Sequence, residues 1–327
     1  MSAHKTALIF GVTGQDGSYL SELLLSRGYR VHGVVRRSSV DNRTRLSSFM
    51  GQMTLHDGDL ADAGSIWRII AAVKPDEIYN LAAQTHVAVS FDEPEHTSDI
   101  NALGVTRILE AVRTLAPRAR FYQASTSELF GQGGGDLNEE SPMLPASPYG
   151  AAKLYAFNMV RIYRKAYGLF ACNGILFNHE SPRRGGDFVT AKIANFAKTL
   201  RNGTWDGQPL TLGNLDAARD WGHARDYAQG MWQMLQADQP DDFVLATGVS
   251  KSVRDFVNAA IPGLVWSGQG KDETASQSDG RLIVKIDTAL FRPIDVPALR
   301  GDSAKARVAL GWTPQTDFGA LVDEMVG

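Results

Sequence analysis

The sequence predicts an α/β protein with a doubly wound parallel sheet and a smaller, interleaved C-terminal domain. Strand-like and helix-like segments alternate through the first half, and a glycine-rich turn follows the first strand. The second half is less regular and rich in proline, glycine and tryptophan. Parallel strands joined by right-handed crossovers follow from this alternation. We expect residues 1–177 and 216–249 in the sheet domain, and 178–215 and 250–327 in a substrate domain.

Apolar runs and the residues that end them define the individual elements. The expected strands are Thr6–Phe10, Arg30–Val35, Met53–His56, Glu77–Ala82 and Arg120–Ala124. The expected helices are Ser18–Ser26, closed by Gly28, then Ile66–Val73, Val105–Leu115 and Ala151–Tyr163. The run Gly133–Gly135 and the stretch from Asn138 to Pro148 indicate a loop. The polar stretch Gly268–Gly280 indicates a mobile surface excursion.

Composition excludes several classes of protein. The 327 residues hold 33 Lys+Arg and 36 Asp+Glu, a formal net charge of -3, which argues against a nucleic-acid partner. Apolar runs fall short of the roughly 20 residues that span a bilayer, and the N-terminus lacks a signal-peptide pattern. Cys172 is the single cysteine, so an intrachain disulfide or a cysteine-rich metal site is excluded. We expect a cytoplasmic protein without a membrane partner and without a metal.

The turn after the first strand has the context of a dinucleotide site. Gly11, Thr13, Gly14, Gln15, Asp16 and Gly17 all lie in this GxxGxxG run, which opens the first helix. Glycine permits a tight turn and a close approach of the backbone, and the helix N-terminus favours a diphosphate. The alternative is an ordinary strand–helix turn that needs glycine for a positive φ. The position in the first unit of an α/β chain favours the Rossmann-type nucleotide site.

The end of the second strand favours NADP over NAD. An acidic residue there would bind the ribose hydroxyls of NAD, but this chain has Arg36 and Arg37, followed by Ser38 and Ser39. A guanidinium matches the geometry of the 2′-phosphate. A solvated basic turn or a subunit contact is the alternative. Asp59-Leu60, after the third strand, could flank the adenine, although an aspartate in a turn is more often a cap.

Tyr149 and Lys153 are candidates for proton transfer. They are four residues apart at the start of a predicted helix, so both side chains lie on one face. A free tyrosine has a pKa of about 10, which a nearby ammonium and a cationic nicotinamide would lower. Tyrosine and lysine at this spacing also occur by chance. The pair gains weight because it follows an α/β pattern that carries the glycine loop.

A hydroxyl-rich segment with one carboxylate follows the fifth predicted strand. Ser125-Thr126-Ser127-Glu128 would lie where parallel sheets bind ligands, so its hydroxyls could bond a reacting oxygen. Glu128 could move a proton on carbon. The alternative is a capping box in which Glu128 partners Ser125. This motif by itself favours the capping box, and the presence of Tyr149 and Lys153 downstream makes the two interpretations about equal.

Longer motifs resemble the GDP-mannose 4,6-dehydratase family of the extended short-chain dehydrogenase/reductase superfamily. The matching stretches, which cover nearly the whole chain, are Gly11–Ser39, Tyr79–Phe91, Phe121–Gly131, Ser147–Ala156, Gly174–Gly185, Leu212–Tyr227 and Lys285–Trp312. FNHESP and GNLDAARDWGHA are the most specific motifs, whereas the superfamily shares the glycine loop. The resemblance implies NADP as cofactor and GDP-mannose as substrate.

The resemblance also implies roles for single residues. Tyr149 would be the base on the sugar 4-hydroxyl, Lys153 would bind ribose and tune Tyr149, Thr126 would hold O4, and Glu128 would serve C5 and C6. Further cofactor contacts implied by the motifs are Ala82, Ala83, Gln84, Lys153, His179 and Arg184. The implied substrate contacts are Thr85, Asn178, Val189, Lys192, Arg219 and Arg292.

The implied chemistry is an internal redox cycle. Hydride leaves C4 for NADP, Glu128 removes the C5 proton and returns it as water leaves C6, and the hydride is then delivered to C6. A 4-epimerase or reductase would not need Glu128. Ala146 and Ala191 stand where the family usually has arginine, so another GDP-sugar, such as a GDP-heptose, stays open. Two further alternatives also stay open: an NADP-dependent epimerase or reductase, and a non-catalytic NADP-binding protein. The resemblance favours a homodimer or a homotetramer.

Overall fold

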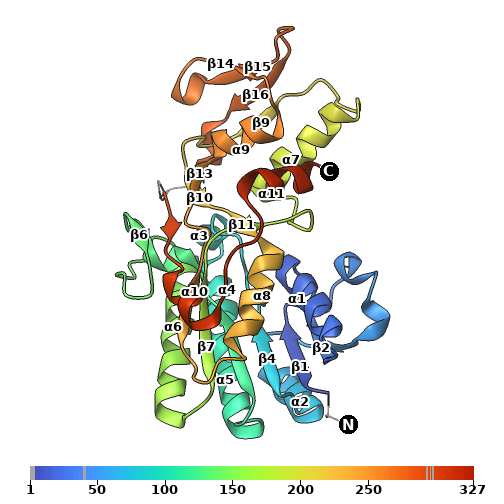
Figure 1. Ribbon diagram of the computed structural model, residues 1–327, viewed down its shortest axis with the longest axis vertical. Coiled ribbons are helices and arrows are strands. Elements are labelled where there is room, and N and C mark those ends of the chain that lie inside the picture. Colours follow the sequence, from blue (N-terminus) through green and yellow to red (C-terminus); the bar gives the residue numbers. More distant parts are fainter. Residues whose placement is uncertain (1–3, 40–41, 292–293, 295, 297) are drawn as a thin grey trace.

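A seven-stranded parallel sheet is the largest element of the computed structural model, which describes residues 4–39, 42–291, 294, 296 and 298–327 (Figure 1). The strands lie in the order β12-β7-β5-β4-β1-β2-β3. They are β1 (Thr6–Phe10), β2 (Arg30–Val35), β3 (Thr54–Asp57), β4 (Glu77–Asn80), β5 (Arg120–Ala124), β7 (Ala171–Leu176) and β12 (Asp242–Leu245). The chain moves outward from β1 to β3 and then returns to β4 on the other side of β1. Such a reversal creates a crevice at the carboxyl ends of the strands.

Helices cover both faces of this sheet. On one face lie α1 (Gln15–Ser26), α8 (Ala224–Met234) and α10 (Ala304–Leu310). On the other lie α2 (Ala63–Val73), α5 (Gly104–Leu115) and α6 (Pro148–Tyr167). The apolar sides of α1 and α8 share one buried core, and those of α2, α5 and α6 share a second. The prediction of a doubly wound α/β fold is therefore confirmed.

A smaller part of the molecule stands above the carboxyl edge of the sheet in Figure 1. Its sheet has the strand order β14-β15-β16-β9. Its elements are α7 (Val189–Arg201), β9 (Leu210–Leu212), α9 (Val253–Ala260), β14 (Val265–Ser267), β15 (Thr274–Ser276), β16 (Leu282–Ile286) and α11 (Phe318–Val326). They enclose a core of their own. The division at residues 177/178, 215/216 and 249/250 stays a prediction.

The remaining elements are short. Three two-stranded pairs are β6 (Asp136–Leu137) with β17 (Arg300–Gly301), β8 (His179–Glu180) with β11 (Gly222–His223), and β10 (Ala218–Asp220) with β13 (Ser250–Ser252). The short helices are α3 (Val89–Asp92), α4 (Pro94–Ser98), η1 (Thr44–Leu46), η2 (Met50–Gln52), η3 (Asp99–Leu103), η4 (Ser127–Phe130), η5 (Gly270–Asp272) and η6 (Thr288–Leu290). Within the described ranges, we find no helix with the length and hydrophobicity that a bilayer crossing requires.

The expectation for Gly268–Gly280 needs a correction: most of the stretch is exposed, as expected of a surface excursion, but it contains regular structure. This stretch holds η5 and β15, and β15 is paired on both sides, with β14 and β16. Ala275 in the middle of β15 is fully buried in the core of the smaller part. One small apolar residue between polar neighbours leaves almost no periodic signal, although it fixes which face of the strand is inside.

A single π-helical turn, η3, fixes the chain after β4. The Asn101 side chain in η3 donates to the carbonyl oxygen of Gln84 at 2.8 Å and accepts from the Gln84 N–H at 2.8 Å. Asn101 is almost fully buried. Its side-chain amide therefore satisfies both polar groups of the Gln84 backbone, as a neighbouring strand would. Wide helical turns of this kind often occur at functional sites.

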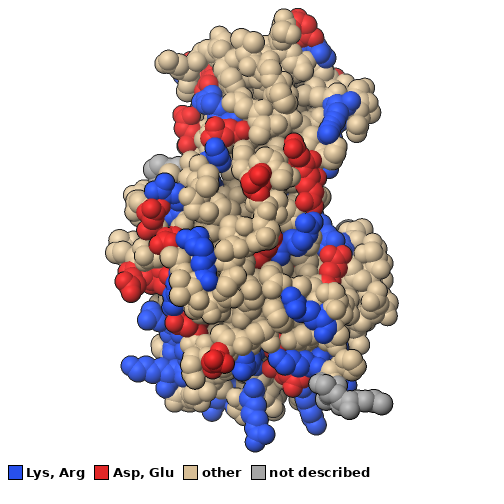
Figure 2. Space-filling view, viewed as in Figure 1, with Lys and Arg blue, Asp and Glu red and all other residues tan. Residues whose placement is uncertain are grey.

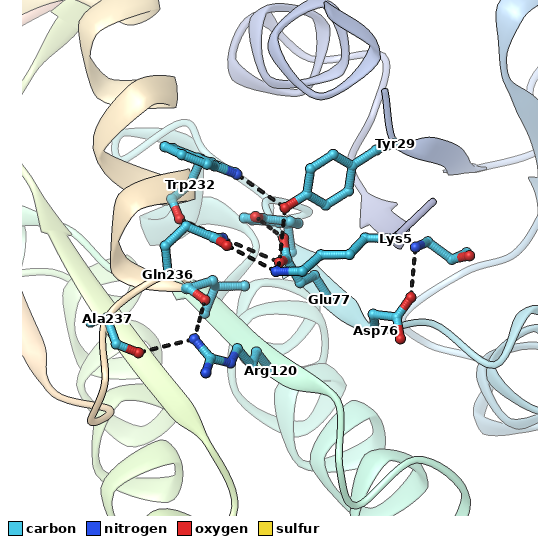
Figure 3. Close-up of polar contacts among 11 residues, drawn as sticks. Lys5, Tyr29, Asp76, Glu77, Arg120, Trp232, Gln236 and Ala237 are labelled. Atoms are coloured by element: carbon cyan, nitrogen blue, oxygen red, sulfur yellow. Dashed lines mark hydrogen bonds and ion pairs between the residues drawn. The ribbon is translucent and has the colours of Figure 1, made fainter. Parts of the chain in front are cut away.

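A buried carboxylate joins several elements at the amino edge of the sheet, opposite to the crevice (Figure 3). One oxygen of Glu77 accepts from Lys5 Nζ at 2.9 Å, the Tyr29 hydroxyl at 3.0 Å and Gln236 Nε2 at 3.2 Å. The other oxygen accepts from the Tyr79 hydroxyl at 2.7 Å. Glu77 itself is 1% exposed. These bonds attach the segment after α8 to β1, β2 and β4.

Glu77→Ala should lower the free energy of unfolding by about 2–4 kcal/mol, because it leaves buried donors without an acceptor. Urea unfolding followed by tryptophan fluorescence measures the change. Asp76→Asn is the matched control, since Asp76 is the adjacent, exposed carboxylate and its bond from the Thr6 N–H can be kept by the amide oxygen. Equal losses in the two variants would contradict a special role for the buried network.

Candidate active site

A cavity of about 590 Å³ opens at the carboxyl edge of the main sheet. Residues that follow β4, β5 and β7 line one side of it, and residues of α7, β9 and β10 line the other. The molecular outline in Figure 2 narrows between the two parts, and lysine and arginine gather at the lower end, near the N-terminus. The cavity thus lies where open parallel sheets bind ligands.

The four predicted catalytic residues line this one cavity: Thr126, Glu128, Tyr149 and Lys153. Tyr149 lies in the first turn of α6, where Ser147 caps the helix by accepting from the Gly150 N–H at 3.0 Å. This cap explains why α6 begins at Pro148, earlier than the predicted Ala151.

A glycine brings the tyrosine and the carboxylate together. A Cβ atom at Gly150 would lie 2.8 Å from the carbonyl oxygen of Glu128, too close for any other residue type. The N-terminus of α6 therefore packs directly on η4, which carries Glu128. Thr126 caps η4, and its hydroxyl accepts from the Glu128 N–H at 3.2 Å. The alternative of a capping box between Ser125 and Glu128 is wrong, because the cap is one residue later.

Burial controls the proton affinities in the site. Desolvation raises the pKa of the Tyr149 phenol, a hydrogen bond with Thr126 opposes the rise, and the charge of Glu128 adds to it. Desolvation also lowers the pKa of Lys153 to about 8. Lys153 Nζ donates to the carbonyl oxygen of Ala124 at 3.0 Å and lies 5.8 Å from the centre of the Tyr149 ring. In the protein alone the phenol keeps its proton, so its use as a base needs further positive charge beside it.

The glycine loop fits a dinucleotide. Gly11 has φ +80, and a Cβ atom there would lie 2.7 Å from the backbone nitrogen of Ala82. A Cβ atom at Gly17 would lie 2.5 Å from the carbonyl oxygen of Gly11. The loop is thus a tight backbone turn pressed against the chain after β4, at the N-terminus of α1. Backbone turns of this shape bind diphosphate groups.

Gln15 and Asp16 form hydrogen bonds with the segment that follows β7. Gln15 Nε2 donates to the carbonyl oxygen of His179 at 3.1 Å, and Gln15 Oε1 accepts from the Ser181 hydroxyl at 2.7 Å. His179 pairs through Nε2 with Asp16 at 2.9 Å and through Nδ1 with the carbonyl of Phe177 at 2.7 Å. Burial opposes the charge of His179, but Asp16 and the Phe177 carbonyl outweigh it, so the pKa of His179 is raised. The ion pair of His179 with Asp16 therefore joins the segment after β7 to α1.

Arg184 lines the cavity and has a buried carboxylate as its partner. Its Nε lies 3.0 Å from Glu180, which also accepts from the Thr190 hydroxyl at 2.6 Å. The guanidinium stacks on Phe188, 3.6 Å from the ring centre. Glu180 thereby orients Arg184 and the start of α7. Sequence analysis missed this role, since only the three-dimensional fold brings these residues together.

Several predicted cofactor residues lie away from the cavity wall. Arg36 and Arg37 are exposed directly after β2, next to the strand that carries the glycine loop. The Asp59 side chain accepts from the Ala61 N–H at 2.9 Å within a turn, whereas the N-cap of α2 is Asp62, so the cap alternative for Asp59 is wrong. The Leu60 side chain is buried in the core. Of the predicted cofactor residues Ala82, Ala83 and Gln84, Ala83 lines the cavity. All of these residues share the carboxyl edge of the sheet.

The predicted substrate residues come together in the cavity as far as the structure describes them. Thr85, Asn178, Val189, Lys192 and Arg219 line it, and Arg292 lies outside the described residues. The guanidinium of Arg219 donates to the carbonyl oxygens of Ala218 at 2.9 Å and Val296 at 2.7 Å.

Ser125 belongs to the site, although the sequence alone gave it no fixed role. It is buried and lines the cavity, and its hydroxyl has no hydrogen-bond partner among the described residues. A buried hydroxyl of this kind is suited to a ligand. Its place directly after β5 was the available signal.

The two arginine-to-alanine departures lie near the site. Ala191 is buried in the first turns of α7, between the cavity residues Thr190 and Lys192. Ala146 precedes the Ser147 cap of α6. Neither side chain lines the cavity.

Comparison with known proteins matches nearly the whole chain to one family. A family model described as GDP-mannose 4,6 dehydratase covers residues 8–325. The chain belongs to this family. The GDP-mannose 4,6-dehydratase of Sinorhizobium fredii (strain HH103) is 50% identical over 341 residues, covering 100% of this chain and 97% of that protein. The GDP-mannose 4,6 dehydratase of Homo sapiens is 50% identical over 336 residues, covering 98% and 90%.

A solved structure supports the fold. The UDP-glucose 4-epimerase of Thermus thermophilus, solved with NAD, superposes with a TM-score of 0.83 over 98% of this chain and 97% of that one. Its sequence identity is 24%, so the likeness concerns the fold and not the reaction. Membership of the dehydratase family together with this fold confirms the resemblance inferred from the motifs.

Proposed function

We propose that this chain converts GDP-mannose to GDP-4-keto-6-deoxymannose by removing water, with NADP as a cofactor that the cycle restores. One observation carries the proposal: Glu128 lines the same cavity as Tyr149 and Lys153. A tyrosine and a lysine suffice for oxidation at C4, but loss of water across C5 and C6 needs a further group that moves a proton.

The cofactor would be held by the glycine loop, Arg36 and Arg37, Ala82–Gln84, Lys153 and the 179–184 segment. NADP, when bound, supplies the chemistry of hydride transfer, from C4 in the first half of the cycle and to C6 in the second. The tight turn at Gly11 and the unpartnered hydroxyl of Ser125 support this placement.

Tyr149 takes the proton from the 4-hydroxyl, with Thr126 as hydrogen-bond partner. Burial holds the proton on the free phenol by raising its pKa, and a cationic group nearby shifts the balance toward the phenolate. Lys153 stays fixed by the Ala124 carbonyl beside the ring. The 4-keto group then makes the C5 proton more acidic.

Glu128 takes this C5 proton and gives it to the 6-hydroxyl, which leaves as water. A proton from solvent is added back at C5 when C6 is reduced. The balance is the loss of one water from the sugar and no net oxidation. The same carboxylate serves as base and then as acid, which suits its half-buried position.

Substrate contacts are proposed for Thr85, Asn178, Val189, Lys192, Arg219 and Arg292. The wall made by α7, β9 and β10 supports a site for the nucleotide part on the side of the smaller domain. A homodimer or homotetramer and a cytoplasmic location stay predictions.

Isotope transfer tests the proposal. The purified protein is incubated with GDP-mannose that carries deuterium at C4, and the product is examined by mass spectrometry and NMR. We expect loss of one water, deuterium at C6 and no build-up of NADPH. An epimerase would change configuration at C4 or C3 and keep the water, and a reductase would consume NADPH in proportion to product. Either result would overturn the proposal.

A further inference from the structure

We propose that Arg45 is a positioning residue that holds the glycine loop against the 179–184 segment and so retains the cofactor through both halves of the reaction. This inference rests on the proposed function for the identity of the cofactor. Arg45 lies in η1, a short helix between β2 and β3, and sequence analysis assigned it no role.

The Arg45 guanidinium bridges two chain segments. Its Nε donates to the carbonyl oxygen of Arg183 at 2.7 Å, and its Nη1 donates to the carbonyl oxygen of Thr13 at 3.2 Å. Thr13 lies in the middle of the glycine loop, and Arg183 follows β8 in the chain. These two segments are far apart in sequence, so a single half-buried side chain fixes their spacing.

Other bonds attach the same segment to α1, including residues 15 and 16, where the glycine run enters the helix. Arg183 donates to the Ser18 hydroxyl at 3.1 Å and to Glu22 at 2.8 Å. Gln15 and Asp16 bond to His179 at the N-terminus of α1. The helix is thus attached along its first two turns, while Arg45 reaches the turn that precedes it.

Positive charge also concentrates here. The charges of Arg184 and Arg183 act on Arg45, so three guanidiniums lie close together beside the N-terminus of α1. Arg183 is paired with Glu22 and Arg184 with Glu180, whereas the bonds of Arg45 go to carbonyl oxygens. A diphosphate bound by the glycine loop would add negative charge beside this cluster.

Retention of the cofactor matters more in this reaction than in an ordinary dehydrogenase. If the reduced cofactor left after the first half, the sugar would remain a 4-keto compound and could not be reduced at C6. A loop that opens easily would allow this escape. Bonds that fix the loop from outside lower its rate of opening. We therefore expect them to lower the dissociation rate constant of the cofactor and to change the association rate constant little.

Arginine suits this position better than lysine. The planar guanidinium directs separate N–H groups to two carbonyls, whereas a lysine ammonium is a single point of charge on a flexible stem. The two contacts of Arg45 come from different nitrogens, Nε and Nη1. The geometry of the fork, and not the charge alone, is therefore what holds the loop.

Binding of NADP to Arg45→Ala and Arg45→Lys variants tests the proposal. Isothermal titration of the full chain gives the dissociation constant, and a competition experiment gives the release rate. We expect both variants to bind NADP about tenfold more weakly, a change of about 1.4 kcal/mol, mainly through faster release. Arg68→Ala removes an exposed arginine of α2 and should leave NADP binding unchanged.

Three results would overturn the proposal. One is wild-type affinity in Arg45→Lys with weaker binding in Arg45→Ala, which would show that charge alone matters. The second is wild-type affinity in both variants, which would show that Arg45 has no part in retaining the cofactor. The third is a lower melting temperature without NADP in Arg45→Ala but unchanged affinity, which would show a structural role. If Arg45→Ala does not fold, Arg45→Lys and Arg45→Gln carry the test. A wild-type protein that binds NADP but leaves GDP-mannose unchanged would refute the proposed function and not this inference.

Discussion

Glu128→Gln is expected to reduce formation of the 6-deoxy sugar by about 10²–10⁴-fold, the usual contribution of a proton-transferring side chain. Glutamine has the same shape but can neither take the C5 proton nor protonate the 6-hydroxyl. Oxidation at C4 does not use this carboxylate, so it should continue. The variant should therefore accumulate a 4-keto sugar that still carries its 6-hydroxyl, together with reduced cofactor.

Absorbance of the reduced cofactor and mass spectrometry of the sugar follow the two halves separately. Glu140→Gln is the control, because Glu140 is an exposed carboxylate in the following loop. The dehydratase assignment would fail if Glu128→Gln released water at the wild-type rate. Loss of both halves together would instead show that Glu128 holds the site in shape.

Tyr149→Phe should reduce oxidation at C4 by about 10²–10⁴-fold, because the ring remains but the proton acceptor is removed. Here the first half fails, so neither reduced cofactor nor a 4-keto sugar should form. Binding of NADP should change little, since the bond from Lys153 to the Ala124 carbonyl does not depend on the phenol.

Single-turnover absorbance and NADP titration measure these two effects. Tyr155→Phe is a matched control on the same helix, where Tyr155 is 41% exposed and its hydroxyl lies 3.3 Å from that of Thr106. Equal loss of activity in both variants would refute a special role for Tyr149. The contrast with Glu128→Gln is the sharper result, because the two variants should stop at different compounds.

Local sequence patterns predicted most of the main sheet. The strands Thr6–Phe10, Arg30–Val35 and Arg120–Ala124 agree with the structure, because each is a short segment dominated by apolar and aromatic residues, as buried parallel strands usually are. The expected Glu77–Ala82 strand ends at Asn80, where the chain turns toward Gly11. The catalytic set could be named because its spacing and the family motifs are local too.

Contacts between distant segments could not be predicted. Asp16 and His179, or Arg45 and Arg183, are partners only because the sheet order brings their segments to one edge. Composition gives no signal for such pairs, and each residue alone resembles an ordinary surface charge. The β15 strand was missed for a related reason, since its burial depends on neighbours on both sides and not on its own sequence.

The paired bonds between Asn101 and Gln84 have a consequence for how ligands enter. They fix the chain after β4, beside the crevice, before any ligand binds, so we expect this segment to lose little conformational freedom when a dinucleotide docks. The site for the dinucleotide is therefore preorganised at this point and does not depend on a closing motion. We therefore expect conformational change on ligand binding to be concentrated in the opposite wall, in the smaller part of the molecule.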